Sequence, residues 1–189
     1  LAFDCRGLSP GPSSSLPERG ALLGLREIPT GCEAIEILPG PHLADAGAML
    51  PVIRAQMALG QRLAGLPGIA AVSWLPARSW MQPGYFRKVM TDWLQGGAFP
   101  ALGLTTLELR EGGGFVTVGL GFLIGQELEL NLTEGMGQAQ IARLAIRLVH
   151  ELVTEGPIRE ERELLGPGGE RLQARPLRGG ASVEVGWAP

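Results

Sequence analysis

The segment from residue 103 to residue 132 constrains the fold most, because its apolar side chains recur at every second position. In the middle of this segment the even-numbered residues Val116, Val118 and Leu120 are apolar, whereas Thr117 and Gly119 between them are polar or small. Alternation with a period of two is typical of a strand that buries one of its faces. The segment therefore predicts a strand whose apolar face lies against a core.

Shorter runs on both sides of this strand predict its two partner strands. Gly112 and Gly113 suit the positive φ of a two-residue hairpin turn, which would set Leu109 opposite Val116. A three-residue loop over residues 125–127 would set Ile124 opposite Leu128 and keep Glu129 away from the core. Together the runs predict a three-stranded antiparallel meander.

Three helices are predicted from apolar residues that recur at i, i+3 and i+4, over residues 51–66, 85–95 and 138–153. The third helix has the widest apolar stripe and follows the meander directly, so we expect it to cover the apolar face of the meander. Leu144 and Leu148 should then be buried, while Arg143 and Arg147 stay exposed.

Further strands are predicted over residues 21–27, 32–38 and 69–75, and a closing hairpin with its turn at 179–180 would set Leu172 opposite Trp187. The nearly apolar run 69–75 suits a central strand, which would follow the first helix by a parallel crossover if it shared a sheet with 32–38. Residues 76–83 and 156–169 are predicted as loops.

The predicted order β-β-α-β-α-β-β-β-α-β-β indicates an α+β fold, a largely antiparallel mixed sheet with about three helices packed on it. Residues 1–20 contain the run SPGPSSSLP, which is too rich in proline and serine for an element interior and predicts a mobile N-terminal segment. Residues 21–189 are predicted to form a single domain.

Composition excludes several classes of function. A net charge of −3 gives no reason to expect binding to nucleic acid or to a membrane surface, and no apolar run reaches the length of a membrane span. Two cysteines are too few for a disulfide framework and predict free thiols in the cytoplasm. The two histidines lie far apart and outside ligand-like spacings, so neither a metal nor a cofactor is predicted.

One stretch of the chain resembles a known bacterial family. Residues 117–130, TVGLGFLIGQELEL, are similar to the T-x-G-L…G-x-E-x-E pattern of domain-of-unknown-function family 4261. The closing segment from Gly156-Pro157 to Val183 also resembles that family, and so does the predicted strand 69–75 with the Trp80-to-Phe86 loop that follows it. The likeness covers about residues 69–187. The resemblance implies a soluble bacterial α+β domain, and it implies no activity because the family has none assigned.

Acidic and basic residues supply the first group of candidate site residues. Glu127 and Glu129 could share acid–base work if their environments separated the two pKa values, or they could simply be solvated. Arg143 and Arg147 lie one helical turn apart and could bind an anion, or they could pair with Glu151 or water.

The second group of candidates surrounds an aromatic-rich loop, with Arg78, Ser79, Trp80 and Tyr85. Its aromatic side chains either belong to the core or form an exposed anchor for a partner. These observations favour a non-enzymatic binding or protein-interaction domain that takes a protein partner or forms a homo-oligomer. The alternative is an enzyme of unknown reaction that uses Glu127 and Glu129 with an arginine, and no residue is assigned as catalytic.

Overall fold

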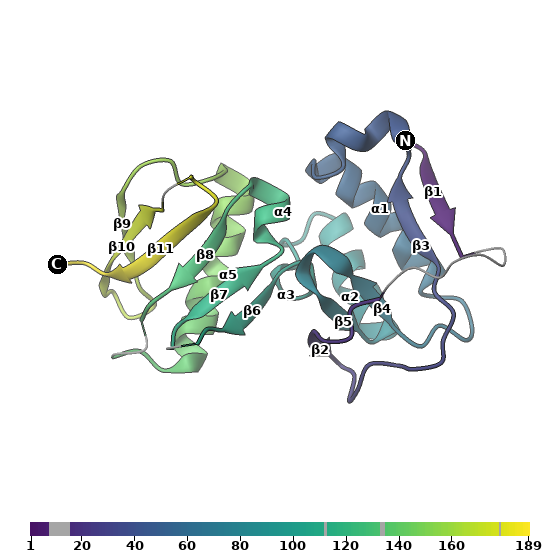
Figure 1. Cartoon of the computed structure of the whole chain (residues 1–189), viewed down its shortest axis with the longest axis horizontal. Helices are drawn as coiled ribbons and strands as arrows, with labels where there is room; N and C mark the ends of the chain where they lie inside the picture. The colour runs from purple at the N-terminus through teal and green to yellow at the C-terminus, as the bar shows by residue number, and fades with distance from the viewer. Residues whose placement is uncertain (8–15, 112, 133–134, 178) are drawn as a thin grey trace. The chain divides into compact units, whose positions relative to one another are not determined.

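The structure is a computed structural model that describes residues 1–7, 16–111, 113–132, 135–177 and 179–189. It shows the α+β fold that the sequence predicts, with five helices and eleven strands in mixed sheets among the described residues (Figure 1). The chain divides into two compact units, Leu1–Gly103 and Leu104–Pro189. This boundary falls inside residues 21–189, the region that the sequence predicts as one domain.

Unit 1 contains two small sheets and two longer helices. In one sheet β1 (Phe3–Arg6) pairs antiparallel with β3 (Glu36–Pro39), and in the other the strand order is β2-β5-β4. The remaining elements are β2 (Ala21–Leu23), β4 (Val72–Trp74), β5 (Ser79–Met81), the 3-10 helices η1 (Pro41–Ala46) and η2 (Leu75–Ala77), and the helices α1 (Leu50–Leu63), α2 (Pro83–Leu94) and α3 (Ala101–Leu104), the last of which spans the boundary between the units.

The core of unit 1 forms where α1 and α2 pack together. Their buried side chains come from the predicted apolar stripes and are Val52, Ile53, Met57, Phe86, Met90 and Trp93. The predicted helices are confirmed, although α1 ends at Leu63 rather than at Leu66 and α2 begins at Pro83. Pro83 suits a first helical position, and the Gln82 side chain caps α2 by accepting from the Tyr85 N–H at 2.8 Å.

Two strand predictions in unit 1 are wrong. The run 69–75 was expected to be a central strand, but β4 is an edge strand, and β5 lies in the predicted loop 76–83 as the central strand. The cause is a tight reversal, because Arg78 adopts a left-handed conformation with φ 48° directly before β5. The chain therefore folds back, and β5 pairs with β4 on one side and with β2 on the other.

The beginning of the chain also differs from its prediction. Phe3–Arg6 lies inside the segment predicted to be mobile, but it forms β1 and pairs with β3. Strands β3 and β4 lie in different sheets, and therefore the parallel crossover between them, which was predicted only if they shared a sheet, is not formed. Gly7 explains how β1 can lie so close to its partner, because a Cβ at this glycine would stand 2.0 Å from the Ala34 carbonyl oxygen. Most of the SPGPSSSLP run lies outside the described residues.

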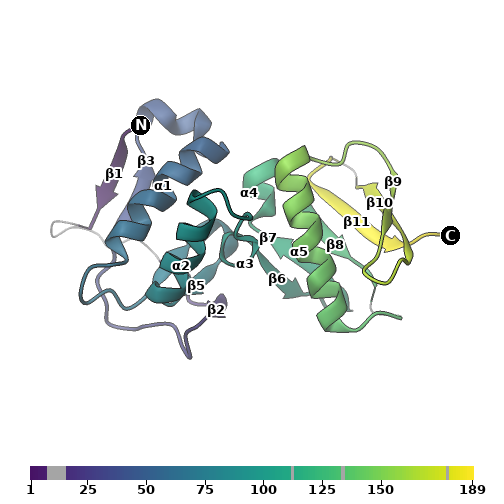
Figure 2. The ribbon, with the colours of Figure 1, turned by 180° about the vertical axis from the view of Figure 1, so that it is seen from behind.

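Unit 2 is a six-stranded sheet with the order β6-β7-β8-β11-β10-β9, in which only β8 and β11 are parallel. Figure 2 shows α5 lying across one face of this sheet, and we call that the inner face and the opposite one the outer face. The elements are β6 (Thr106–Leu109), β7 (Phe115–Val118), α4 (Leu120–Ile124), β8 (Glu127–Leu130), α5 (Gln138–Glu155), β9 (Arg162–Leu165), β10 (Arg171–Pro176) and β11 (Ser182–Trp187).

The core of unit 2 lies between α5 and the inner face. Leu144 and Leu148 of α5 are completely buried, and Arg143 and Arg147 are exposed, as predicted. The predicted apolar face of the central meander strand is wrong, however, because Val116 pairs with Glu129 on the outer face, whereas Phe115 pairs with the buried Leu130. The sheet contributes side chains that are likewise completely buried, namely Leu128, Leu130, Leu172, Ala174, Val183 and Val185.

The closing hairpin has the predicted register, with Leu172 opposite Trp187. The predicted loop 156–169 is wrong in part, because Arg162–Leu165 forms β9 and pairs antiparallel with β10. Only Leu164 of this strand is buried, opposite Leu172, and its neighbours include two charged residues. One buried residue in four is too short a pattern for period-two alternation to reveal a strand.

The predicted register of the meander is wrong at both turns. Leu109 pairs with Phe115 rather than with Val116, and Ile124 belongs to α4 rather than to a strand opposite Leu128. The alternation fails because Gly119 and Gly125 take left-handed conformations, with φ 93° and 80°, and turn the chain into a short helix between them.

Candidate functional site

The aromatic-rich candidates belong to the interior of unit 1. Ser79 is completely buried and its Oγ donates to the Gly103 carbonyl at 2.5 Å, while Trp80 is only 4% exposed. Arg78 is exposed, and the half-buried Tyr85 hydroxyl lies 3.5 Å from the Leu102 carbonyl, where burial raises the pKa of Tyr85. The geometry therefore favours the core interpretation of this segment over an exposed anchor.

Glu127 is held by three hydrogen bonds within unit 2. Its carboxylate accepts from Thr117 Oγ1 at 2.6 Å and from the backbone N–H groups of Gly119 and Gly121, both at 2.8 Å. Thr117 Oγ1 in turn accepts from the Leu128 N–H at 2.7 Å. These contacts join β7, the start of α4 and β8, which gives Glu127 a structural role.

The other charged candidates are not brought together. Glu129 forms an ion pair with Arg110, which the sequence analysis did not single out. Arg143 and Arg147 lie on α5, which packs on the inner face, and Arg147 donates to the Leu165 carbonyl oxygen. Of the two candidate glutamates, Glu129 is therefore the one with an arginine partner, and that partner is Arg110 rather than Arg143 or Arg147.

Acidic side chains form a row across the outer face of unit 2. Direct pairing between neighbouring strands joins, in order, Glu108, Val116, Glu129, Glu184 and Arg175. Arg175 then donates to Glu161, which stands just before β9. We call these six residues the acidic row, because four of them carry a carboxylate and only one carries a guanidinium group.

Hydrogen bonds fix several members of the acidic row. Arg175 contacts the two carboxylate oxygens of Glu161 at 3.1 and 3.3 Å, which lowers the pKa of Glu161 and raises that of Arg175. Glu184 accepts from Asn131 Nδ2 at 2.8 Å. Arg110 and Arg175 form ion pairs with Glu129 and Glu161. The charge of Glu184 also acts on Arg175 and contributes to raising its pKa.

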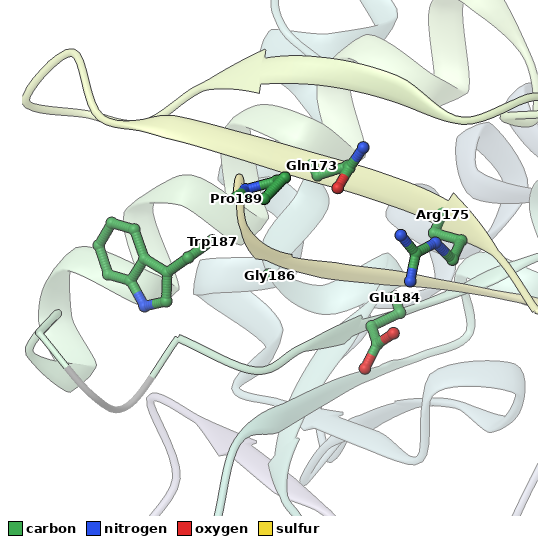
Figure 3. Close-up of a pocket in the computed structure, with 6 residues that line it drawn as sticks. All are labelled: Gln173, Arg175, Glu184, Gly186, Trp187 and Pro189. Atoms are coloured by element: carbon green, nitrogen blue, oxygen red, sulfur yellow. The ribbon is translucent and has the colours of Figure 1, made fainter.

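A shallow hollow of about 260 Å³ lies beside the acidic row on β10 and β11 (Figure 3). It is lined by Gln173, Arg175, Glu184, Gly186, Trp187 and Pro189. Gly186 forms its floor without a side chain, and a Cβ added there would meet no heavy atom within 4 Å. Trp187 is 40% exposed and offers an aromatic surface at one end.

The residues of this hollow were not among the sequence candidates, although the sequence held a signal for them. The predicted hairpin register already sets Arg175 opposite Glu184 and Gln173 opposite Gly186, on the face away from Leu172 and Val185. Apolar alternation identifies the buried side of a hairpin, and it does not distinguish a binding surface from ordinary solvated residues on the exposed side.

Other kinds of site find no support in the part of the chain that the structure describes. No cluster of three or more histidine, cysteine, aspartate or glutamate side chains there is suited to hold a metal ion, and Cys5 and Cys32 are free and exposed. Among the same residues, no helix combines the length and the apolar character needed to cross a membrane.

Comparison with known proteins adds no relative. No protein-family model, no curated protein and no solved structure matches the chain.

Proposed function

We propose that this chain is a non-enzymatic binding domain whose outer face in unit 2 holds a basic segment of a protein partner. The observation that carries the proposal is the acidic row, which runs across the sheet and passes the hollow at Gly186. The opposite face of the same sheet is occupied by α5, so the outer face is the surface that this unit offers to a partner.

Charge complementarity supports a basic partner. The row contains four glutamates and one arginine, together with the valine between two of the glutamates, and Arg110 pairs with one of these glutamates, so that carboxylates outnumber guanidinium groups among the named residues. Surfaces of opposite charge attract one another during association and suppress wrong partners. Lysine or arginine side chains of a partner would therefore be favoured over this row.

The hollow supplies the second requirement of a protein interface, a place for an anchor. Interfaces gain most of their binding energy from a few aromatic and arginine side chains. Trp187 and Arg175 are residues of these kinds, and the missing side chain of Gly186 lets a partner approach the sheet closely.

The enzymatic alternative has less geometric support. Both oxygens of Glu127 are used in local hydrogen bonds, and Glu129 is paired with Arg110. Two carboxylates act as acid and base when their environments drive their pKa values apart, and these two are instead tied to separate structural partners. The resemblance to family 4261 and a bacterial, cytoplasmic origin remain part of this proposal.

A peptide selection tests the proposal directly. A phage library of random 12-residue peptides is selected on the full chain, and the dissociation constants of the enriched peptides are measured by calorimetry. We expect the enriched peptides to be basic. Their affinity for the double variant Glu129→Gln/Glu184→Gln should be at least about tenfold lower, which corresponds to a loss of about 1.4 kcal/mol in binding free energy. Gly186→Tyr should weaken binding as well, because its side chain fills the hollow without a steric conflict at Cβ.

The matched control is Glu18→Gln/Glu33→Gln, which removes the same charge from exposed positions in unit 1. This control should bind as the unchanged chain does. Enriched peptides that are neutral or acidic, or that bind the outer-face variants with unchanged affinity, would contradict the proposal. If the chain associates with itself and the outer-face variants abolish that association, the partner of the outer face would be a second copy of the chain and not a basic segment of another protein.

A further inference from the structure

Two buried polar atoms stand on one face of the β2-β5-β4 sheet of unit 1. Ser73 of β4 and Trp80 of β5 are directly paired in the antiparallel register, so their side chains share a face. Ser73 Oγ and Trp80 Nε1 are both buried, and neither has a hydrogen-bond partner within the described part of the chain.

The two atoms differ in their hydrogen-bonding capacity. An indole N–H can only donate, whereas a serine hydroxyl can donate and accept. A buried polar group without a hydrogen-bond partner destabilises the fold, and such groups are rare in native proteins. Opposite residues of an antiparallel pair have Cβ atoms about 4.5–5.5 Å apart, a spacing at which one water molecule can reach groups on both side chains.

The segment before β2 closes this place from one side. A Cβ at Gly20 would stand 3.3 Å from Trp80 Cδ1, the atom bonded to Nε1, and 1.9 Å from the Arg78 carbonyl oxygen. The Gly20 backbone therefore packs against the edge of the indole ring that carries the N–H. The approach of 1.9 Å to the Arg78 carbonyl oxygen leaves no room for a side chain, so this position requires a glycine.

We infer that Ser73 and Trp80 together hold one buried water molecule, which accepts the indole N–H and bonds the serine hydroxyl. This inference gives Trp80, a candidate that the binding surface does not use, a specific polar role. It is independent of the proposed function, because all of its residues belong to unit 1.

Nuclear magnetic resonance of the full chain tests the inference. The four tryptophans give four indole N–H resonances, and Trp80→Phe identifies the one from Trp80. That resonance should show a cross-peak to water with the sign of a long-lived bound molecule. The indole of Trp187, which is 40% exposed, serves as the reference for contact with bulk water.

The decisive variant is Ser73→Ala, which removes one partner of the water with little change in volume. The long-lived cross-peak should be lost, while the Trp74 and Trp93 resonances stay in place and show that unit 1 is folded. Ser182→Ala in β11 is the control and should leave the cross-peak unchanged. A Trp80 indole without a water cross-peak, or a cross-peak that survives Ser73→Ala, would overturn the inference.

Discussion

Glu127 contributes to the structure through acceptor geometry rather than through reactivity. Its carboxylate receives two backbone N–H groups at the start of α4 and the hydroxyl of Thr117. A helix start leaves N–H groups without intrahelical acceptors, and a carboxylate there satisfies them and interacts favourably with the helix dipole. A glutamate next to a turn can thus look like a site residue in the sequence and be a cap in the fold.

Replacing Glu127 with alanine should lower the free energy of unfolding by about 1.5–3 kcal/mol, the range for hydrogen bonds to a charged group. Glu163→Ala is the matched control, because Glu163 is an exposed strand residue whose ion pair with Arg171 is open to solvent and contributes little to stability. Urea denaturation followed by circular dichroism measures both variants. An equal loss in the two would show that the Glu127 contacts do not stabilise the fold.

Among the elements, the sequence predicted the long helical stripes, and it predicted the register of the closing hairpin but not that of the meander. The stripe of α5 and the register of the β10–β11 hairpin are confirmed, and that hairpin also places the paired residues of the hollow. The sequence pattern did not predict α4. Apolar residues continue to alternate through Gly119 and Gly125, but the left-handed conformations of these glycines form a short helix there instead of a strand. Strand β5 was not predicted either, because a strand of three residues is too short to show a period of two.

The packing of α5 gives a prediction at the same scale. Leu148→Ala should cost about 2–5 kcal/mol, because it leaves a cavity under a completely buried side chain. Arg147→Ala should cost less than about 1 kcal/mol, since Arg147 is exposed and loses only its contact with the Leu165 carbonyl oxygen. Chemical denaturation of the two variants compares them under identical conditions, and a larger loss for the arginine variant would contradict the observed orientation of α5.

The whole molecule consists of two units that each have a core of their own. In unit 2 the buried side chains of α5 face buried side chains of the same unit's sheet. A unit with its own core is expected to fold without the rest of the chain. Local sequence patterns did not predict the boundary at Gly103, because it depends on which elements contact one another and not on any single segment.

Residues 104–189 expressed alone should therefore fold. Their backbone amide resonances should be well dispersed, as in a folded domain. The measurement is a two-dimensional amide spectrum. A collapsed, poorly dispersed spectrum of the shorter chain would mean that unit 2 depends on unit 1 for its stability.

The most direct test of the proposed function is a map of where a selected basic peptide binds. The full chain, labelled with nitrogen-15, is titrated with that peptide, and the shift change of each amide is recorded. We expect the largest changes on β8, β10 and β11, around Glu129, Glu184 and Gly186, and we expect them to become smaller as salt is added. Changes centred instead on α5 or on unit 1 would contradict the proposed function.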